Sequence, residues 1–451
     1  MKIKIEEFAD SINLPFPLRD YQWEGVSFLL NSEFALLADD MGLGKTVQTA
    51  VSCEILYRIR GDLRVLIIVP SSLKINWEKE LKLWAPSLSI QRMRGGNENR
   101  WAYLHLPYNV TIASYEDIRI EYSKSNITTV FDLVVLDEAQ RIKNASSNTS
   151  AMCMRVRKKS GWALSGTPIE NNRQDLISIF DFLKFEYLSD TFSKDEIHHK
   201  MKKHFLRRNK EEVLPEMPPI IEQEIPLELK GDQLKAYYDC LNSNAQYYNE
   251  SSESARILAI ITKLKIICNY HEPSNSSVKF DVLKTIVKES QLNNKKTIIF
   301  SQYVETLKWI GLRLEVYNID YNIYSGELTA GEKDKRLQEF KEFEGPSVIL
   351  MSLKAGGVGL NIQEADTVIL FDRWWNPALE NQAINRAHRF GRERNLHVIK
   401  FSILHSIEEH IAGILEDKED IFSEYIEEAK SLPTELFMNK LMTILSKEVK
   451  K

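Results

Sequence analysis

The residues with the clearest chemistry form a glycine-rich turn inside the segment 34–51, FALLADDMGLGKTVQTAV, where an apolar run gives way to a helix-forming stretch. Gly42 and Gly44 allow backbone N–H groups to approach phosphate oxygens closely, and the helix that follows adds the partial positive charge of its N-terminus. Lys45 would reach the β- and γ-phosphates of a nucleotide, and the hydroxyl of Thr46 would bind magnesium. This spacing predicts a phosphate-binding loop.

The loop departs from the strict phosphate-binding pattern at Asp39, where that pattern has glycine. An ordinary strand-to-helix turn is the alternative, but the strand and helix that the motif requires are expected on both sides. Asp137 and Glu138 directly follow the apolar run FDLVVL. An acidic residue at the end of a neighbouring strand can hold magnesium, and a second carboxylate can polarise the attacking water. Alone such a pair is usually a turn; together with Lys45 it predicts a catalytic role.

Two arginines near the C-terminus add a third element. Arg386 and Arg389 occur in QAINRAHRFGRERN, at a spacing that puts both side chains on one face of a helix. Guanidinium groups delivered across a cleft stabilise charge on a transferring phosphoryl group. A surface salt-bridge pair is the alternative. If the arginines act on the nucleotide, the active site is split between two lobes, and ATP binding closes the cleft between them.

Composition narrows the class of protein. The chain has 451 residues, of which 43% are hydrophobic and 27% charged, as in soluble globular proteins with more than one domain. Apolar runs are too short for a membrane span and the start of the chain lacks the apolar core of a signal peptide, so we expect the protein to stay in the compartment where it is made. The four cysteines stand far apart and form no Cys-x-x-Cys pair, so we expect them to be buried thiols. They are Cys53, Cys153, Cys240 and Cys268.

The charge pattern leaves room for a nucleic-acid groove without requiring one. The formal net charge of −5 argues against a protein that coats itself with nucleic acid. Basic stretches at 155–159 (RVRKK) and 200–210 (KMKKHFLRRNK) could line a groove for a phosphate backbone. A solvated helix face is the alternative, and we favour it for either stretch taken alone.

Short apolar runs alternate with amphipathic segments in two parts of the chain, the pattern of parallel sheets with crossover helices. The runs are FALLA, VLIIV, VTIA, FDLVVL and WALS before Pro215, and TIIF, SVILM, TVILF and HVIKF after about residue 280. Polar or glycine-rich clusters follow nearly all of them, as expected where ligands bind beyond the carboxyl ends of parallel strands. The part between them, 172–280, favours helices and a linker. We predict an α/β fold with lobe one at 1–225, a helical insertion and linker at 226–280, lobe two at 281–425 and a helical tail at 426–451.

Ten blocks of sequence, in order from residue 18 to about 411, resemble the Swi/Snf-related ATPases of helicase superfamily two. They are LRDYQWEGVSFLL, DDMGLGKTVQT, LIIVPSSLKINWEKE, LDEAQRIKN, LSGTPIENN, FLRRNKEEVLPEMPP, LKIICNYHEP, IIFSQYVETL, MSLKAGGVGLNIQEADTVILFDRWWNPALENQAINRAHRFGR and SIEEHI. The resemblance implies two RecA-like lobes of the P-loop NTPase class and the use of ATP and Mg2+. It also implies ATP-driven translocation along double-stranded DNA, generally without strand separation, with DNA-bound protein or an accessory targeting subunit as a protein partner.

The resemblance assigns roles to single residues. The catalytic set is Lys45, Asp137, Glu138, Arg386 and Arg389, with Thr46 and Asp137 as magnesium ligands. Gln22 looks like the glutamine that reads adenine, and the rest of the ATP-binding set is Arg19, Asp40, Met41, Gly42, Leu43, Gly44, Gly359 and Gln382. Residues that contact the DNA strand or couple it to the nucleotide are Lys74, Gln140, Ser165, Thr167, Ser352, Lys354, Gly356, Gly357, Trp374 and Trp375.

Two positions depart from the family pattern. The acidic motif reads DEAQ, with Gln140 where histidine is commoner, and we expect glutamine to be tolerated because it also donates and accepts hydrogen bonds. The arginine motif ends Phe-Gly-Arg where Ile-Gly-Gln is usual, so that Arg392 either contacts phosphate or faces solvent.

Two other functions stay open. One is an RNA-stimulated or strand-separating helicase of the same superfamily, which the blocks MGLGKT, DRWWNP and NRAHRFG disfavour. The other is an ATP-binding scaffold without turnover, which the intact catalytic set disfavours. We expect a cytoplasmic, nucleoid-associated protein if the source is prokaryotic or viral, and a nuclear protein if it is eukaryotic.

Overall fold

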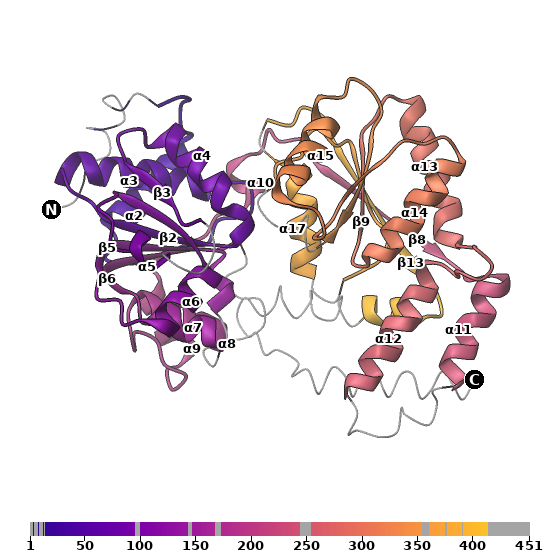
Figure 1. Ribbon diagram of the computed structural model, residues 1–451, viewed down its shortest axis with the longest axis horizontal. Helices are drawn as coiled ribbons and strands as arrows, with labels where there is room; N and C mark the ends of the chain where they lie inside the picture. Colours follow the sequence, from indigo (N-terminus) through magenta and orange to yellow (C-terminus); the bar gives the residue numbers. More distant parts are fainter. Residues whose placement is uncertain are drawn as a thin grey trace. The chain divides into compact units, whose positions relative to one another are not determined.

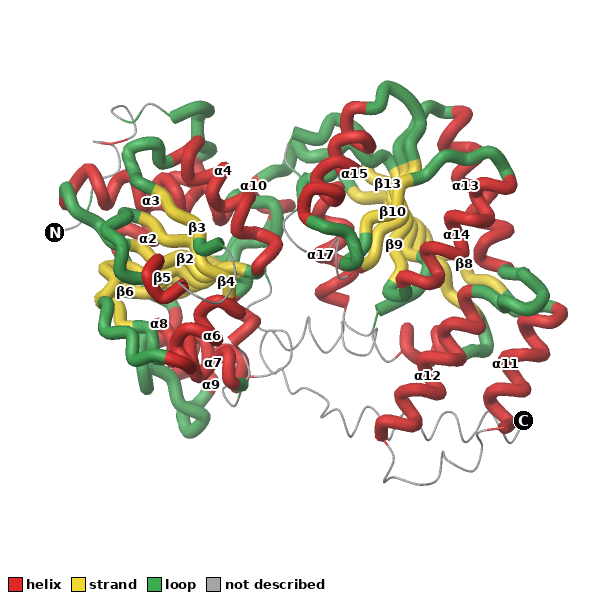
Figure 2. The backbone as a smooth tube through the Cα atoms, viewed as in Figure 1, coloured by secondary structure: helices red, strands yellow, loops and turns green. Residues whose placement is uncertain are grey.

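The chain forms two compact units, which divide between Pro215 and Glu216. The computed structural model describes residues 3, 8, 12, 14–94, 100–142, 147–166, 173–243, 254–353, 360–374, 377–389 and 391–413. Each unit is a parallel β-sheet with helices on both faces (Figure 1 and Figure 2). The predicted α/β fold of two parallel-sheet lobes is therefore confirmed, and the finer domain bounds stay predictions.

The sheet of the first unit has the strand order β3-β4-β2-β5-β6-β1-β7 in the described residues, and its pairings are parallel. Its central strands are almost wholly apolar because helices cover both faces. The strands are β1 (Ala35–Leu37), β2 (Val65–Val69), β3 (Ile90–Arg92), β4 (Val110–Ser114), β5 (Val130–Asp137), β6 (Arg157–Leu164) and β7 (Phe205–Leu206). The helices are α2 (Asp20–Asn31), α3 (Lys45–Arg60), α4 (Lys74–Trp84), α5 (Arg100–Tyr103), α6 (Tyr115–Lys124), α7 (Asn148–Met154), α8 (Arg173–Leu183), α9 (Lys194–Met201) and α10 (Lys210–Val213), with 3-10 turns at Ser71–Leu73 and Ala139–Ile142.

Alternate side chains of these strands face the two helical layers. Leu36, Leu66 and Val134 share one buried cluster with residues of α6, α7, α8 and α9. Figure 1 shows α2, α3 and α4 on the other face of the sheet.

The second unit repeats this design with the strand order β10-β11-β9-β12-β13-β8, again in parallel pairs. Ile298 and Val368 pack toward α15 and α17, whereas Ile299 and Ile369 pack toward α13 and α14. The strands are β8 (Ile220–Leu227), β9 (Thr297–Ser301), β10 (Asn322–Tyr324), β11 (Val348–Ser352), β12 (Thr367–Leu370) and β13 (Leu396–Ile403). The helices are α11 (Gly231–Ser243), α12 (Ser254–Asn269), α13 (Val278–Leu292), α14 (Val304–Val316), α15 (Ala330–Glu342) and α17 (Pro377–Ala387).

Two strands lie in the segment 172–280, which the sequence predicts to be helices and a linker. β7 extends the first sheet beside β1, and β8 pairs with β13 along its whole length in the second sheet. Most residues of β8 are exposed, including Glu222 and Glu224. An edge strand of this kind lacks the apolar run that marks the central strands, so the sequence pattern does not reveal it.

The remaining expectations on architecture concern the tail and the cysteines. Ile407 and Ile411, before the tail, are buried against α11 and α12, while the tail 426–451 lies outside the described residues. The four cysteines are buried, as predicted. Among the helices that the structure describes, none is long and apolar enough to cross a membrane.

Candidate nucleotide-binding site

The glycine-rich segment connects β1 to α3 at the carboxyl end of the first sheet. β1 is fully buried, and α3 begins at Lys45 directly after Gly44. Gly42 and Gly44 have φ angles of 92° and 78°, in a region that strains any residue with a Cβ atom. A buried strand, a turn that needs glycine and a helix N-terminus together provide the backbone that binds phosphate.

The ammonium group of Lys45 lies over this loop. Its Nζ atom donates to the carbonyl oxygens of Asp39 (2.5 Å) and Asp40 (3.2 Å). Burial lowers the pKa of Lys45, and the carboxylates of Asp39, Glu138 and others oppose that shift. A cation enclosed in this way is placed among acceptors that it can exchange for phosphate oxygens.

Gln22, the candidate adenine-reading residue, comes from α2. Its Oε1 atom accepts from the backbone N–H of Arg19 (3.1 Å), which orients the carboxamide. A Cβ atom placed on Gly44 would lie 2.6 Å from Nε2 of Gln22. The carboxamide therefore packs against the phosphate loop, and the loop glycine leaves the space for it.

The acidic pair stands at the end of β5. Asp137 is 9% exposed, and its Oδ2 atom accepts from Nε1 of Trp77 (2.7 Å) while Oδ1 accepts from the backbone N–H of Glu138 (3.0 Å). Burial and, next, the Glu138 carboxylate raise the pKa of Asp137 to about 6. Tyr115 donates to the Asp137 carbonyl (2.8 Å) and so fixes the backbone at the strand end.

Glu138 has a φ angle of 53°, which is unusual for a residue with a side chain. Its Oε2 atom accepts from Nε2 of Gln140 (2.7 Å), and Oε1 of Gln140 accepts from the Ser165 hydroxyl (2.9 Å). The glutamine that departs from the family pattern thus bridges the acidic motif and the end of β6. Thr167, the other residue predicted to take part in this coupling, lies outside the described residues.

A buried arginine that the sequence analysis missed also reaches the loop. Arg208 donates from Nε and Nη2 to the two carboxylate oxygens of Asp39 (3.0 and 2.6 Å). Asp39 and Arg208 are far apart in the chain. The sequence signals were the place of Arg208 in the block FLRRNKEEVLPEMPP and that of Asp39 in a loop where the strict pattern has glycine.

The candidate arginine fingers belong to the second unit. Arg386 lies in α17 and is 5% exposed, and Gln382 is buried in the same helix. Arg389 follows the end of this helix at Ala387, so the two arginines do not share one helical face as the spacing predicts.

Arg392 neither faces solvent nor extends toward a ligand, which corrects both expectations. It is 8% exposed and its Nη1 atom donates to the carbonyls of Ala365 (2.5 Å) and Gln363 (3.0 Å). Its Nε atom donates to the Arg394 carbonyl (2.6 Å) and Nη2 to the Asn395 carbonyl (2.9 Å). The guanidinium group therefore joins the backbone of residues 363–365 to that of residues 394–395, directly before β13.

The residues associated with DNA are engaged within their own units. Lys74 donates to Oδ2 of Asp117 (2.8 Å), and Ser352 is buried at the end of β11. The backbone N–H of Trp374 donates to Oε1 of Glu380 (2.5 Å), and its ring packs against the cluster under α17. Six of the predicted ATP or DNA residues are outside the described residues: Thr167, Lys354, Gly356, Gly357, Gly359 and Trp375.

The basic stretch 155–159 is not the solvated helix face that we favour from its sequence. Arg155 donates to the Tyr122 carbonyl (2.7 Å), and β6 begins two residues later. Lys158 lies over the Phe182 ring, 4.0 Å from its centroid, and burial lowers its pKa to about 8. Strand alternation turns only Lys158 toward α8, whereas Arg155, Arg157 and Lys159 are exposed.

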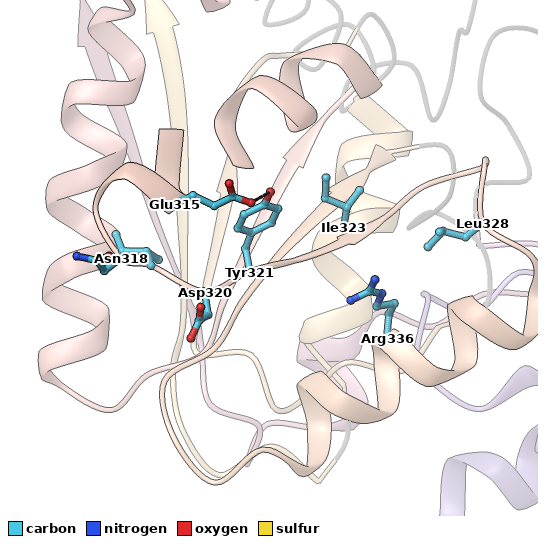
Figure 3. A pocket seen from close by; sticks show the side chains of 8 residues that line it. Glu315, Asn318, Asp320, Tyr321, Ile323, Leu328 and Arg336 are labelled. Atoms are coloured by element: carbon cyan, nitrogen blue, oxygen red, sulfur yellow. Dashed lines mark hydrogen bonds between the residues drawn. The ribbon is translucent and has the colours of Figure 1, made fainter. Parts of the chain in front are cut away.

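A hollow of about 600 Å³ in the second unit is lined by none of the predicted site residues (Figure 3). It opens between the end of α14 and the start of β10, on the amino side of that strand, whereas ligands of parallel sheets bind at the carboxyl side. The hydroxyl of Tyr321 donates to Glu315 in it (2.8 Å). Its lining mixes polar and apolar side chains, and the Nη1 atom of its arginine, Arg336, donates to Oδ1 of Asn322 (2.6 Å).

The acidic pair ends β5, which β6 separates from β1, so it is not on the strand next to the loop strand as the sequence predicts. Two parallel sheets, a phosphate loop and an acidic pair at the end of a strand of the same sheet define a P-loop ATPase core with two RecA-like lobes. A family model described as the SNF2-related domain matches residues 21–272, and the helicase conserved C-terminal domain matches residues 278–391. The chain belongs to the SNF2-related family, and the resemblance seen in its sequence is confirmed.

Known relatives come from bacteria and eukaryotes. An uncharacterized ATP-dependent helicase of Mycoplasma genitalium is 34% identical over 430 residues, which cover 90% of this chain and 42% of that protein. The putative ATP-dependent helicase/translocase YwqA of Bacillus subtilis is 33% identical over 451 aligned positions, covering 91% and 49%. The solved SWI2/SNF2 ATPase core of Sulfolobus solfataricus in complex with dsDNA is 28% identical, with a TM-score of 0.45 and 97% of both chains covered. The chain thus spans less than half the length of these two curated relatives.

Proposed function

We propose that the chain is an ATP-dependent translocase on double-stranded DNA that uses ATP hydrolysis to remodel or displace DNA-bound protein. The observation that carries the proposal is the SNF2-related match across a loop in which the charge of Lys45 interacts with the carboxylates of Asp137 and Glu138. The Bacillus subtilis relative is named a putative helicase/translocase. A relative in Schizosaccharomyces pombe, 30% identical, is named a chromatin remodeling factor.

The phosphate loop supplies most of the binding energy for the nucleotide in this proposal. The N–H groups around Gly42 and Gly44 and the N-terminus of α3 receive the phosphates, and Lys45 exchanges its carbonyl acceptors for phosphate oxygens. Gln22 borders the same loop and is proposed to hydrogen-bond the adenine edge. Positioning and charge stabilisation account for nearly all catalysis of phosphoryl transfer, so these contacts are the core of the mechanism.

The donor set at this loop fits Mg2+. Among the described residues no group of three or more His, Cys, Asp or Glu could hold a metal alone. Magnesium bound with nucleotide needs only one or two protein oxygens because phosphates and water supply the rest. Thr46 and Asp137 would provide them, and the charge of Asp137, which burial disfavours, would be offset by the cation. The metal, when bound, neutralises charge on the β- and γ-phosphates.

Glu138 is the proposed acceptor for the proton of the attacking water. Its backbone is held at a strained φ angle of 53°, and Gln140 donates to one of its carboxylate oxygens. Arg386 and Arg389 are proposed to stabilise the charge of the transferring phosphoryl group from the second unit, an effect worth about three to five orders of magnitude in rate. We propose a nucleoid or nuclear location, where duplex DNA is available.

The steady-state ATPase rate tests the proposal. It should be measured without nucleic acid and with duplex DNA, single-stranded DNA or double-stranded RNA, at low and moderate salt. We expect strong stimulation by duplex DNA that salt weakens, because phosphate contacts release counterions. Equal stimulation by double-stranded RNA would favour a different helicase, and stimulation by none of them would contradict the translocase.

Two variants separate turnover from binding. Glu138→Gln should abolish phosphate release while ATP binding persists, and Arg389→Ala should do nearly the same. Glu33→Gln is the control, since Glu33 is an exposed partner of Lys184 in the first unit. Unchanged nucleotide binding with no turnover in the unmodified chain would instead indicate a scaffold.

A further inference from the structure

The last segment of the first unit runs beside the phosphate loop. This exit segment, residues 204–213, contains β7 and α10, and two residues separate its end from Glu216, where the second unit begins. Its pairing with β1 does not stop at the end of β7. At every second residue, a backbone N–H group of β1 or of the loop donates to a backbone carbonyl of the exit segment. The pairs are Leu36 to His204 (2.7 Å), Ala38 to Leu206 (2.7 Å) and Asp40 to Arg208 (3.0 Å). The exit segment is thus hydrogen-bonded to the loop itself.

Side chains reinforce this attachment. The guanidinium group of Arg208 binds both oxygens of the Asp39 carboxylate, and the two side chains are 8% and 0% exposed. Its Nη1 atom also donates to the Tyr21 carbonyl in α2. A bidentate charged pair that is shielded from water fixes geometry as well as charge.

The space around this pair is shaped to hold it. Gln48 of α3 donates to Asp39 Oδ2 (3.2 Å) and to the Leu43 carbonyl (3.1 Å), and it accepts from Arg208 (3.1 Å). A Cβ atom placed on Gly25 of α2 would lie 1.7 Å from Oε1 of Gln48 and 2.9 Å from Nη2 of Arg208. Glycine at position 25 therefore leaves the space that Gln48 and Arg208 occupy. The hydrogen bonds of these two side chains join α2, the loop, α3 and the exit segment.

The loop end of the network is the one that would respond to nucleotide. Lys45 donates to the carbonyls of Asp39 and Asp40, and the same two residues bind the exit segment through the Asp39 carboxylate and the Asp40 N–H. The exit segment binds Asp40 a second time, because the N–H of Lys210 donates to its Oδ2 atom (3.1 Å). A change in the acceptors of Lys45 must therefore alter the backbone to which the exit segment is attached.

We propose that Arg208 is a positioning residue through which the conformation of the exit segment depends on whether the phosphate loop holds nucleotide. The change in the exit segment is then transmitted along the chain to the second unit. The inference rests on the proposed ATP binding. From Lys210 the chain continues through α10, capped by Asn209 and Glu212, to Pro215, and the first strand of the second sheet begins at Ile220. The covalent connection is short, so an altered exit segment acts directly on the start of β8.

A role of Arg208 in stability alone is the competing explanation, and Arg208→Lys distinguishes the two. Lysine keeps the positive charge beside Asp39 but cannot form the bidentate contact. Arg92→Lys is a matched control. Arg92 belongs to β3, at the opposite edge of the same sheet, and forms a partly buried ion pair with Glu78 of α4 (2.6 Å). Gly25→Ala is a second test, which displaces Gln48 and Arg208 without removing a charge.

Hydrogen exchange of the full chain with and without ADP, and with a non-hydrolysable ATP analogue, measures the response of residues 204–213. We expect nucleotide to slow exchange there in the unmodified chain and in Arg92→Lys. In Arg208→Lys and Gly25→Ala at saturating nucleotide, that slowing should be lost, and nucleotide affinity should fall about tenfold, the scale of one charged hydrogen bond.

Each outcome decides the question. Nucleotide binding without slowed exchange at 204–213 in the unmodified chain would overturn the inference, as would equal slowing in Arg208→Lys. A lower melting temperature of Arg208→Lys with an unchanged nucleotide response would show that the pair of Arg208 and Asp39 serves stability alone. That result would also overturn the inference. Failure of the unmodified chain to bind either nucleotide would refute the proposed function itself, and the same titration reveals it.

Discussion

Trp77 donates the N–H of its indole ring to the Asp137 carboxylate over 2.7 Å, and so joins α4 to the end of β5. The bond has a chemical consequence because it favours the ionised form of a carboxylate whose pKa burial and Glu138 raise. Trp77 is itself 1% exposed, so no water molecule from bulk solvent can readily take its place. The candidate magnesium ligand is therefore oriented by a residue that does not touch the nucleotide loop.

Trp77→Phe should weaken the use of magnesium. Loss of an outer partner of a metal ligand typically costs about 10- to 100-fold in metal affinity or activity. We expect the magnesium concentration for half-maximal ATPase rate to rise by about that factor. Trp84→Phe is the control, because Trp84 makes the same kind of bond to Glu80 (3.0 Å) on the same helix. Equal magnesium dependence in the two variants would contradict the assignment.

Asp137→Asn should stabilise the fold at neutral pH while it abolishes turnover. The pKa of this carboxyl rises from 3.8 to about 6 on folding, so the folded state binds its proton more tightly than the unfolded state. The stability from this group is full below about pH 4 and is lost as the pH rises through 6. Asparagine cannot ionise, so the variant keeps this part of the free energy of unfolding at high pH. The part is at most about 3 kcal/mol, because the pKa of Asp137 rises by roughly two.

Calorimetry without nucleotide and with a metal chelator checks this difference. The melting temperature of Asp137→Asn should exceed that of the unmodified chain at pH 8, and the two should converge near pH 4. A lower melting temperature of the variant at pH 8 would show that the Asp137 charge stabilises the fold.

Gln140→Leu should uncouple the acidic motif from the end of β6. The change removes the bonds of Gln140 to Glu138 and to Ser165, so the Glu138 carboxylate loses its orientation. We expect kcat of the ATPase to fall about tenfold, the scale of one charged hydrogen bond, with little change in KM for ATP. Gln140→His should retain most of the rate.

Ser165→Ala provides the second arm of that test. If the three residues act as one chain, Gln140→Leu and the double variant should be almost equally slow. Additive losses in the double variant would mean that Ser165 acts independently of Gln140.

Arg392→Gln should destabilise the second unit although glutamine is the usual family residue. The guanidinium group satisfies carbonyls of Gln363, Ala365 and Asn395, and a carboxamide cannot reach them all. Buried carbonyls without donors cost about 1–3 kcal/mol each, so unfolding of this unit should begin at a clearly lower urea concentration. Arg394→Gln is the control, since Arg394 is exposed and pairs loosely with Asp366 (3.6 Å). Equal midpoints for the two variants would contradict the structural role of Arg392.

The sequence predicted best those features that local pattern determines. The phosphate loop around Lys45 and the apolar strands such as β2 and β9 carry their own signals, because glycine spacing and continuous burial leave a mark in the residues themselves. The two-lobe fold followed from their alternation with helices.

The missed features depend on contacts between distant segments. Arg208 lies in a basic stretch that resembles a solvated surface, and only the fold brings it to Asp39. Arg392 binds backbone carbonyls, which have no residue signature, so its sequence context suggested a phosphate or solvent. Arg389 shows a limit of periodicity, because the helix ends before the second arginine of the pair.

The parallel pairing of β8 with β13 has a consequence for solubility. A fragment that began at residue 281, the predicted start of lobe two, would lack β8 and would leave the backbone of Leu396–Ile403 as an unprotected sheet edge. Such an edge, apolar and eight residues long, is a template for pairing with other chains, so the fragment should aggregate. The charged residues of β8, Glu222 and Glu224, instead close the sheet with a strand that discourages further addition.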